Sequence, residues 1–343
     1  MDEDLRNGSL TNQIGSSISA DDLFVLGQVV VYSRRLMVNR KDIKAAYSRI
    51  LPSVRKTPVI DLEAGGFGNE TPLTLKLELL QHAGSFKPRG AFNRVLNTTL
   101  PSAGVVAASG GNHGIATAHV ANQLGIPANI FVPSISSPVK QARIAELGAT
   151  VHVGGDVYAD ALAASERFLE TQDALSVHAY DHPDVIAGQG TVGLEWEEQS
   201  PELDTVLVAV GGGGLIAGIC AWYAGRVNVI AVEPETSCAL HSARAAGAIT
   251  KVSVSGVAAD SLGASTIGGL AFEITQAYLH DGVLVSNEAI REAQKRLWKG
   301  MRISAEPGGA TALAAILSGA YKPKAGERVG VLVCGGNVDL STL

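Results

Sequence analysis

A lysine set between a phenylalanine and a proline is the first candidate for chemistry in this sequence. Lys87 follows Phe86 and precedes Pro88 within the run SFKPRGA, residues 85–91. Because proline is favoured in the first turn of a helix, we expect Lys87 at a helix entrance, pointing into a cleft. Most lysines are solvated surface residues. A lysine shielded from water can instead form a Schiff base or act as a base.

Three strand-like runs end in glycine-rich turns. The turns are SGGNHG at residues 109–114, CGGN at 334–337, and the four residues Gly211, Gly212, Gly213 and Gly214. Each turn alone can be ordinary turn chemistry. Together they indicate close backbone approach to a ligand, because glycine is costly to order. The four consecutive glycines leave N–H groups unshielded at a helix start near Leu215, which predicts a phosphate site.

The four-glycine turn also fits a dinucleotide-binding pattern. Gly212, Gly214 and Ala217 match the loose form of that fingerprint, and Glu233 lies about twenty residues further on, where a ribose-binding acid is expected. This pattern alone predicts a nicotinamide-dependent oxidoreductase. It leaves Lys87 and the other two glycine-rich turns unexplained, so it stays the alternative from a different functional class.

The elements that must position these residues alternate between strands and helices. The expected strands are Leu73–Leu77, Val105–Ala108, Asn129–Val132, Thr150–Val153, Thr205–Val210, Val227–Val232 and Val329–Val333. The expected helices include one from Asp42 onward and Gly114–Leu124, Val139–Leu147, Tyr158–Thr171, Leu215–Ala224 and Glu288–Met301. Continuously apolar strands alternating with helices are typical of parallel sheets covered on both faces. We predict an α/β fold of two open parallel-sheet domains with helices on both faces, binding ligands at the carboxyl ends of the strands.

The composition limits the classes of partner and the cellular compartment that we expect. The chain has 343 residues, of which 46% are hydrophobic, 17% charged and 5% aromatic, and its net charge is −6. These values support a large aliphatic core and argue against nucleic acid or an anionic membrane as the partner. The cysteines are Cys220, Cys238 and Cys334. An odd number without metal-ligand spacing favours a reducing cytoplasm over a disulfide framework.

The N-terminal residues differ in composition from the rest. Residues 1–36 are rich in Ser, Gly, Asn and Asp, so we expect a poorly ordered extension over residues 1–40, with Met37 as an alternative start. The apolar run Leu23–Tyr32 follows acidic residues and is shorter than a membrane helix or a convincing secretory signal requires. The sequence therefore predicts a soluble, cytoplasmic protein.

The motifs follow one another in a fixed order, SFKxRGA, SGGNHG, four glycines and CGGN. In this order they resemble the serine/threonine dehydratase (ammonia-lyase) branch of the fold-type-II, tryptophan-synthase-β-like pyridoxal-phosphate enzymes. The resemblance covers residues 42–343. It implies pyridoxal 5'-phosphate as the cofactor and, as the activity, the removal of water and ammonia from a small β-hydroxy amino acid.

The resemblance implies a role toward the cofactor for residues of each motif. It implies a Schiff base on Lys87, the ring packed against Phe86, the phosphate on Gly211–Gly214, the ring hydroxyl bonded to Asn112, and Glu306 facing the cofactor. It places Cys334 beside the pyridine nitrogen, where a thiol cannot keep that nitrogen protonated as a carboxylate would. Loss of the β-hydroxyl is then favoured over transamination. Without the resemblance, Cys334 would be interpreted as a small buried hydrophobe and Glu306 as a helix-start acid.

The resemblance also implies a substrate site next to the cofactor. The turn expected to receive the substrate carboxylate consists of Ser109, Gly110, Gly111, Asn112 and His113. Ser85 and His82 are expected at the border of the pocket, although a histidine beside a motif is more often structural.

Gly110 and Ala239 depart from patterns found elsewhere in that family. Amino acid racemases carry SSGNHG, in which the second serine is a base on the far face of the cofactor, and Gly110 stands at that position, so we expect little racemisation. Several relatives bind a divalent cation through a Glu, a backbone carbonyl and an Asp. Glu233 and Ser237 match the first two, but Ala239 replaces the Asp, so no metal is expected there and Glu233 is then structural.

The sequence leaves the substrate and the assembly open. L-threonine and L-serine are the leading substrates; a hydroxyaspartate or phenylserine lyase, a racemase, and a relative that binds ligand without catalysis remain alternatives. We expect a large cofactor-binding domain from residues 41–103 and 175–343 and a small mobile domain from residues 104–174, with the cofactor between them. By analogy with the family we expect a homodimer, and because the chain ends soon after CGGN, no regulatory domain.

Overall fold

The computed structural model describes residues 25–26, 29–30, 37–67, 69 and 71–339. The chain divides into two units, residues 1–37 and 38–343. In the first unit, strands β1 (Val25–Leu26) and β2 (Val29–Val30) form an antiparallel pair. Most of the extension predicted for residues 1–40 lies outside the described residues. The fold of the second unit carries the rest of the argument.

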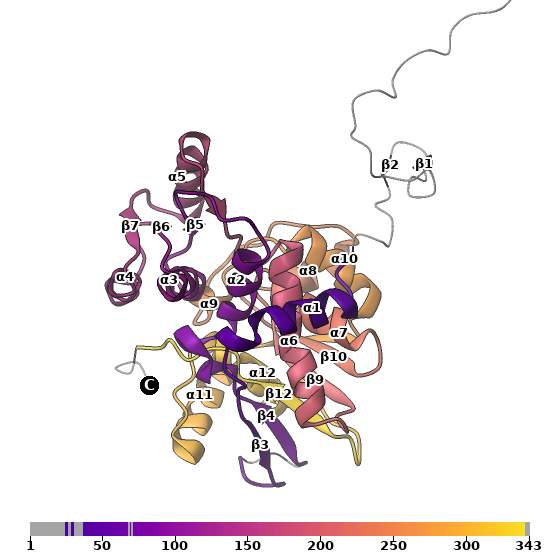
Figure 1. The fold of residues 1–343 in the computed structure, drawn as a ribbon. Coiled ribbons are helices and arrows are strands. Elements are labelled where there is room, and N and C mark those ends of the chain that lie inside the picture. Colours follow the sequence, from indigo (N-terminus) through magenta and orange to yellow (C-terminus); the bar gives the residue numbers. More distant parts are fainter. Residues whose placement is uncertain (1–24, 27–28, 31–36, 68, 70, 340–343) are drawn as a thin grey trace, which may run out of the picture. The chain divides into compact units, whose positions relative to one another are not determined.

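The larger sheet of this unit has six strands in the order β11-β10-β9-β12-β4-β3 (Figure 1). Its strands are β3 (Val59–Leu62), β4 (Leu73–Lys76), β9 (Thr205–Ala209), β10 (Asn228–Pro234), β11 (Asp281–Val285) and β12 (Val329–Leu332). Neighbours run parallel, except that β3 runs antiparallel to β4 at one edge. β9 and β12 are buried throughout, as their continuously apolar sequences predict.

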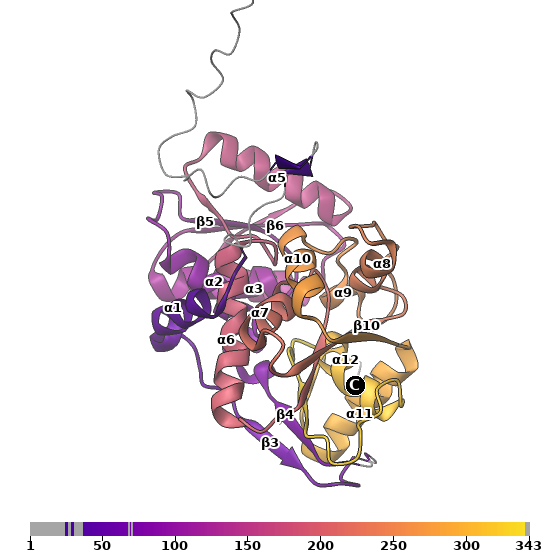
Figure 2. The same cartoon turned by 90° about the vertical axis from the view of Figure 1, so that its right-hand side faces the viewer.

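The smaller sheet has four parallel strands in the order β7-β6-β5-β8. Its elements are β5 (Val105–Ala108), β6 (Ala128–Val132), β7 (Thr150–Val153), β8 (Leu175–Ser176), α3 (Asn112–Leu124), α4 (Pro138–Glu146) and α5 (Tyr158–Thr171). Figure 2 shows α5 on one side of β5 and β6 and α3 on the other. Ile115 and Ile144, from α3 and α4, share one apolar cluster, whereas Ala161 of α5 packs with Val106 and Phe131 in another. Helices therefore cover both faces.

The remaining helices surround the larger sheet. They are α1 (Arg40–Ile50), α2 (Lys87–Leu96), α6 (Pro183–Gln199), α7 (Gly214–Tyr223), α8 (Ala239–Ala246), α9 (Ala259–Leu262), α10 (Gly269–Tyr278), α11 (Asn287–Met301) and α12 (Pro307–Leu317), with the short 3-10 turns η3 (Leu51–Ser53), η4 (Glu78–Leu80) and η5 (His82–Gly84). α6 packs against α1, α2 and α7, and α12 packs against β9 and β10. Local sequence sets the start of α1. The side chain of Asn39 caps this helix by accepting from the N–H of Lys41, and the side chain of Asp42 accepts from the N–H of Asn39.

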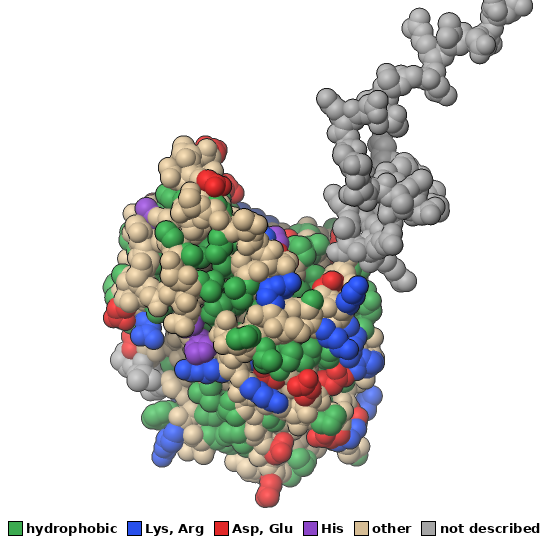
Figure 3. Space-filling model, viewed as in Figure 1, with side chains coloured by type: hydrophobic (Ala, Val, Ile, Leu, Met, Phe, Trp, Pro, Cys, Tyr) green, Lys and Arg blue, Asp and Glu red, His purple; other side chains and the backbone are tan. Residues whose placement is uncertain are grey.

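The predicted α/β fold is confirmed, with one difference in the larger sheet. β3 is antiparallel, and most of its residues are only half-buried. An edge strand with a solvated face does not need the double covering that keeps parallel strands apolar. Within the described part of the chain, no helix is long and apolar enough to cross a membrane. On the face in Figure 3, basic and acidic side chains lie interspersed.

The order of the central strands brings two of the glycine-rich turns together. β9 and β12 are parallel neighbours, so their carboxyl ends lie at the same edge of the sheet. Gly211–Gly214 follow β9, and the CGGN run follows β12. β4, the other neighbour of β12, leads through η4 and η5 into Lys87. The fold therefore assembles the predicted site at this edge.

Candidate active site

Lys87 opens α2, with Phe86 as the residue before the helix and Pro88 in its first turn. Its Nζ donates a hydrogen bond to the carbonyl of Ala179 at 2.8 Å and lies 5.2 Å from the centre of the Phe86 ring. Burial lowers the pKa of the Lys87 ammonium to about 8, although Cys334 and Glu306 oppose the change. A neutral amine is therefore accessible close to neutral pH, as a Schiff-base lysine or a base requires.

The four-glycine turn runs from the end of β9 into α7. Gly213 has φ +93°, a conformation that side chains disfavour, and a Cβ on Gly214 would lie 2.7 Å from the carbonyl oxygen of Tyr180. The turn therefore needs glycine for both conformation and space. The first N–H groups of α7 have no partner within the helix, and they open onto the cavity that the turn lines. This arrangement suits an anion such as phosphate.

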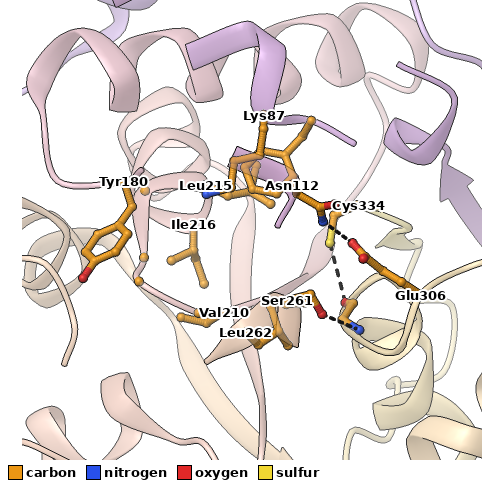
Figure 4. Close-up of a pocket in the computed structure, with 17 residues that line it drawn as sticks. Lys87, Asn112, Tyr180, Val210, Leu215, Ile216, Ser261, Leu262, Glu306 and Cys334 are labelled. Carbon is orange, nitrogen blue, oxygen red and sulfur yellow. Dashed lines mark hydrogen bonds between the residues drawn. The ribbon is translucent and has the colours of Figure 1, made fainter. Parts of the chain in front are cut away.

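Asn112 and Glu306 line the cavity and are hydrogen-bonded to each other (Figure 4). Asn112 begins α3 and donates from Nδ2 to Oε1 of Glu306, the residue that precedes α12. Burial raises the pKa of Glu306 to about 7, although Lys140 and the bond from Asn112 oppose the rise. Glu306 Oε2 is buried without a hydrogen-bond partner among the described residues. A buried carboxyl that titrates near neutrality can hold a proton for catalysis.

Cys334 stands just beyond β12 and is buried. Its Sγ donates to the carbonyl of Gly308 at 3.6 Å. Burial, with Glu306 nearby, raises the pKa of the thiol to about 12. The group at this position is therefore a neutral thiol at any physiological pH, which fits the weak partner predicted for the pyridine nitrogen.

One cavity collects every residue predicted to contact the cofactor (Figure 4). Its lining includes Phe86, Lys87, Asn112, Gly211, Gly212, Gly213, Gly214, Glu306 and Cys334. The groups that pyridoxal phosphate presents match the lining: it offers a lysine amine, an anion-binding helix start, an amide, a neutral thiol and a buried carboxyl with a free oxygen. The residues therefore fit this cofactor. Their individual roles stay predictions.

Most of the residues predicted for the substrate do not line this cavity. Among the described residues that line it, the turn 109–113 contributes only Asn112. Ser109 Oγ accepts from the N–H of Gly111 at 3.2 Å. His113 is buried against the carbonyl of Val177 at 2.7 Å, and burial lowers its pKa to about 3, so it stays neutral.

Ser85 and His82 precede Lys87 and do not line the cavity either. Ser85 is fully buried, and its Oγ has no hydrogen-bond partner among the described residues. His82 stacks on His119 with ring centres 5.0 Å apart, which favours the structural interpretation of this histidine.

The cavity is also lined by residues from two segments that the sequence did not single out: Tyr180 from one, and Ser261 and Leu262 from the other. Tyr180 follows β8, which at two residues is too short to show a strand pattern. Ser261 and Leu262 belong to α9, a four-residue helix, and Ser261 Oγ accepts from the N–H of Gly308 at 3.2 Å. Neither segment carries a glycine motif that could have drawn attention to it.

Glu233 lies near the end of β10 and caps the start of α8. Its Oε1 accepts from the N–H of Leu240 and its Oε2 from the N–H of His241, both at 2.8 Å. Ser237 donates to the carbonyl of Leu262 at 2.8 Å. Within the described ranges, no group of three or more His, Cys, Asp or Glu is placed to hold a metal ion. The carboxylate that the dinucleotide alternative needs for a ribose thus caps a helix.

Comparisons with known proteins identify the family. A family model described as pyridoxal-phosphate dependent enzyme matches residues 50–335. The L-threonine ammonia-lyase of Thermotoga maritima is 35% identical, over 90% of this chain and 77% of the relative. The phenylserine dehydratase of Ralstonia pickettii is 36% identical, over 86% of this chain and 92% of the relative. The structure of maize serine racemase matches with a TM-score of 0.84 and 33% identity, over 89% of this chain and 95% of that one.

These matches favour pyridoxal phosphate over a nicotinamide cofactor and confirm the predicted branch, which holds lyases and racemases of similar sequence. The chain belongs to the pyridoxal-phosphate dependent enzyme family.

Proposed function

We propose that this chain is an ammonia-lyase for a small β-hydroxy amino acid, with L-threonine and L-serine as its leading substrates. The net reaction releases a 2-oxo acid and ammonia; the water lost in elimination is regained when the enamine product is hydrolysed. Support comes from relatives named L-threonine ammonia-lyase and phenylserine dehydratase, and from the cavity at Lys87.

Pyridoxal phosphate, when bound, supplies an aldehyde that bonds to amines and a ring that withdraws electrons from the α-carbon. Lys87 would hold the aldehyde, and its Nζ would take the α-proton of the substrate, because its lowered pKa keeps a neutral amine available. The N–H groups at the start of α7 would hold the phosphate. The neutral thiol of Cys334 would be a weak partner for the ring nitrogen, which favours loss of the β-hydroxyl over transamination.

The single observation that carries elimination over racemisation is that position 110 is a glycine with no room for a serine side chain. This residue has no side chain, and a Cβ built on it would overlap with the side chain of Ser136. A serine at position 110, the base expected of racemases, does not fit while Ser136 keeps its place. A proton removed by Lys87 then has no partner at position 110 to return it from the other face.

Racemisation is the second candidate because Ser136 itself brings a hydroxyl close to the same place. The maize serine racemase match supports it as well. The Ser136→Ala variant separates the two functions, since it removes this hydroxyl without touching Lys87. Elimination that persists in the variant at the wild-type rate supports the lyase. Loss of an enantiomer exchange that the wild type shows supports the racemase.

The test of the proposal is a substrate panel with two readouts. Release of ammonia and 2-oxo acid is followed for L-threonine, L-serine, 3-hydroxyaspartate and phenylserine, and chiral chromatography follows D/L exchange. We expect the highest kcat/KM for elimination with L-threonine or L-serine and exchange at least tenfold slower. Efficient exchange without ammonia release would overturn the lyase.

The domain division and the assembly belong to the same proposal. The separate four-stranded sheet supports a small domain near residues 104–174, although Phe92 and Val95 of α2 share its apolar cluster. Limited proteolysis with and without substrate tests whether this domain closes. The homodimer and the cytoplasmic location stay predictions, for which size-exclusion chromatography and cell fractionation are the direct measurements.

A further inference from the structure

Asn337, the last residue of the CGGN run, joins three separate parts of the active site. Its Nδ2 donates to the carbonyl of Ala83 and to Oδ1 of Asn112, both at 2.8 Å. Ala83 lies in the turn just before Lys87, and Asn112 opens α3. The side chain of Asn337 therefore links the lysine segment, the amide that faces Glu306 and the strand end that carries Cys334.

These contacts fix the direction of each amide. A backbone carbonyl can only accept, so Asn337 must present its NH2 group to Ala83. The atom of Asn112 that faces the same NH2 group must then be its oxygen. The NH2 group of Asn112 is consequently turned toward Oε1 of Glu306. The orientation of both amides therefore follows from the carbonyl of Ala83, which can only accept.

The direction of the hydrogen bonds from Asn337 through Asn112 decides which oxygen of Glu306 can carry a proton. Oε1 accepts from Asn112, so a proton on that oxygen would face a donor. Oε2 is buried and has no partner among the described residues. When Glu306 is protonated, the proton therefore sits on Oε2, the oxygen left free beside the cavity.

Two glycines make room for this arrangement. A Cβ on Gly84 would lie 3.0 Å from Cγ of Asn337, and a Cβ on Gly335 would lie 3.0 Å from Cδ of Glu306, with closer overlaps at the oxygen atoms. Asn337 and Glu306 thus pack against bare backbone. The CGGN run supplies both the amide and the space for the carboxyl group.

Several charged or titratable groups face Glu306 besides Asn112. They are Lys140 of α4, Asp260 of α9, Lys87 of α2 and Cys334 beyond β12. Burial raises the pKa of Glu306 to about 7, and Lys140, the bond from Asn112 and Lys87 oppose the rise, whereas Asp260 adds to it. Removing the donor that Asn112 offers would therefore raise the pKa further.

We propose that Asn337 is a positioning residue that acts through Asn112: it holds the Asn112 amide toward Glu306 and so assigns the acid proton of Glu306 to Oε2. This rests on the proposed function only in giving that proton a use in elimination. The orientation itself concerns the cofactor site, and it can be measured on the holoenzyme without turnover.

The experiment is a double-mutant cycle read by cofactor absorbance against pH. Holoenzymes of wild type, Asn337→Ala, Asn112→Ala and the double variant are titrated, and Glu306→Gln identifies the transition that belongs to Glu306. We expect Asn337→Ala to move this transition upward by roughly one pH unit, the effect of losing one hydrogen bond to a charged group. In the Asn112→Ala background the same change should have no further effect, because the two residues act in series.

Asn228→Ala is the matched control. Asn228 lies on β10, outside the cavity lining, and donates to Thr205 Oγ1 at 3.3 Å. It should leave the transition unmoved. If Asn337→Ala does not fold, Asn337→Asp keeps the shape but cannot donate, and it should shift the transition at least as far. An unmoved transition in a folded Asn337 variant, or an equal shift with and without Asn112, would overturn the proposal.

Failure of this proposal and failure of the proposed function are distinguishable. If the wild type releases no ammonia from any substrate, the lyase is wrong, yet the absorbance cycle still reports on Asn337. If the enzyme is an active lyase, the pH profile of kcat gives a second reading: activity that needs protonated Glu306 falls as pH rises through its pKa, and in Asn337→Ala this fall moves to higher pH.

Discussion

Lys87 and Arg89 stand on either side of Pro88 in the first turn of α2, and the two buried clusters around them differ in how their charges are paired. Arg89 donates to Glu78 Oε1 at 2.7 Å and to Glu195 Oε2 at 3.0 Å. Lys76 completes this cluster with a 2.5 Å contact to Glu195. Lys87, in contrast, has a neutral carbonyl as its hydrogen-bond partner, and Glu306 keeps one oxygen free.

The protonation of each cluster follows from this difference. Burial alone lowers the pKa of Arg89, but Glu78 and Glu195 raise it above its ordinary value. Burial alone raises the pKa of Glu78, but Arg89 and Lys76 bring it below its usual range. In the site, burial prevails: it lowers the pKa of Lys87 to about 8 and raises that of Glu306 to about 7. Pairing with opposite charges thus keeps Arg89 and Glu78 charged, although burial still lowers the pKa of Lys76, whereas Lys87 and Glu306, which lack such pairing, titrate closer to neutral pH.

The comparison separates the parts of one motif. Within the run of residues 85–91, Arg89 is paired with carboxylates and Lys87 is not, although both are long cations on the same helical turn, so we propose a structural role for Arg89 and a chemical one for Lys87. Arg89 also anchors α2 to α6 through Glu195, which holds the helix entrance in place. The paired cluster thus supplies the rigid support on which the unpaired one depends.

The largest effect is expected from removing the amine of the unpaired cluster. Lys87→Met should lower kcat by at least about 10³-fold, because both the covalent link and the general base are lost. Borohydride should no longer attach the cofactor covalently to the peptide that contains residue 87. Activity and peptide mapping measure both results. Near-normal turnover by this variant would mean that Lys87 belongs with the structural cations.

Breaking the paired cluster should instead destabilise the fold. Arg89→Met removes the cation that buried Glu78 and Glu195 share and should reduce the free energy of unfolding by about 3–5 kcal/mol. Denaturant unfolding of the holoenzyme measures the loss. Arg143→Met is the control, because its pair with Glu146 is solvent-exposed and should matter little. Equal stability of the two variants would contradict the structural role of Arg89.

The same substitution at Lys87 should have the opposite sign on stability. The folded pKa of about 8 lies below the ordinary value of 10.5, so the folded state disfavours the charged amine. That penalty is fully present below pH 8 and is relieved as pH rises from 8 to 10.5. With both proteins stripped of cofactor, Lys87→Met should be more stable than wild type by up to about 3 kcal/mol at pH 7, and the gain should vanish at high pH. A loss of stability at pH 7 would show that the amine is better paired than its geometry indicates.

The sequence predicted much of the site because its residues lie in motifs that restrict the backbone. Lys87 beside Pro88, the glycines after β9 and Cys334 after β12 are all found at the one cavity. The bounds of β5, β7 and α5 also agree with the sequence prediction. Short-range turn chemistry and apolar runs are local properties, so one sequence suffices to read them.

What the sequence missed depends on contacts between distant segments. α6 is buried along Val185–Trp196 and so lacks the one-sided pattern by which helices are recognised. The pairing of Arg89 with Glu195 joins α2 to this same helix. Asn337 was part of a motif, but its bond to Asn112 appears only once β12 and α3 are placed. Pairing, which separates the two clusters, is therefore the property that required the structure.

The smallest expected effect concerns metal removal, and it extends the comparison to a third buried charge. Glu233 has both oxygens bonded to backbone N–H groups of α8, and Ala239 offers no carboxylate to complete a cation site. Because binding a cation would take the carboxylate from its helix, dialysis against EDTA should change kcat/KM and Tm by less than the error of measurement. Adding Mg²⁺ or Ca²⁺ should be equally neutral. Activity lost to EDTA and restored by either ion would show that Glu233, like Glu306, has an oxygen free to bind a ligand.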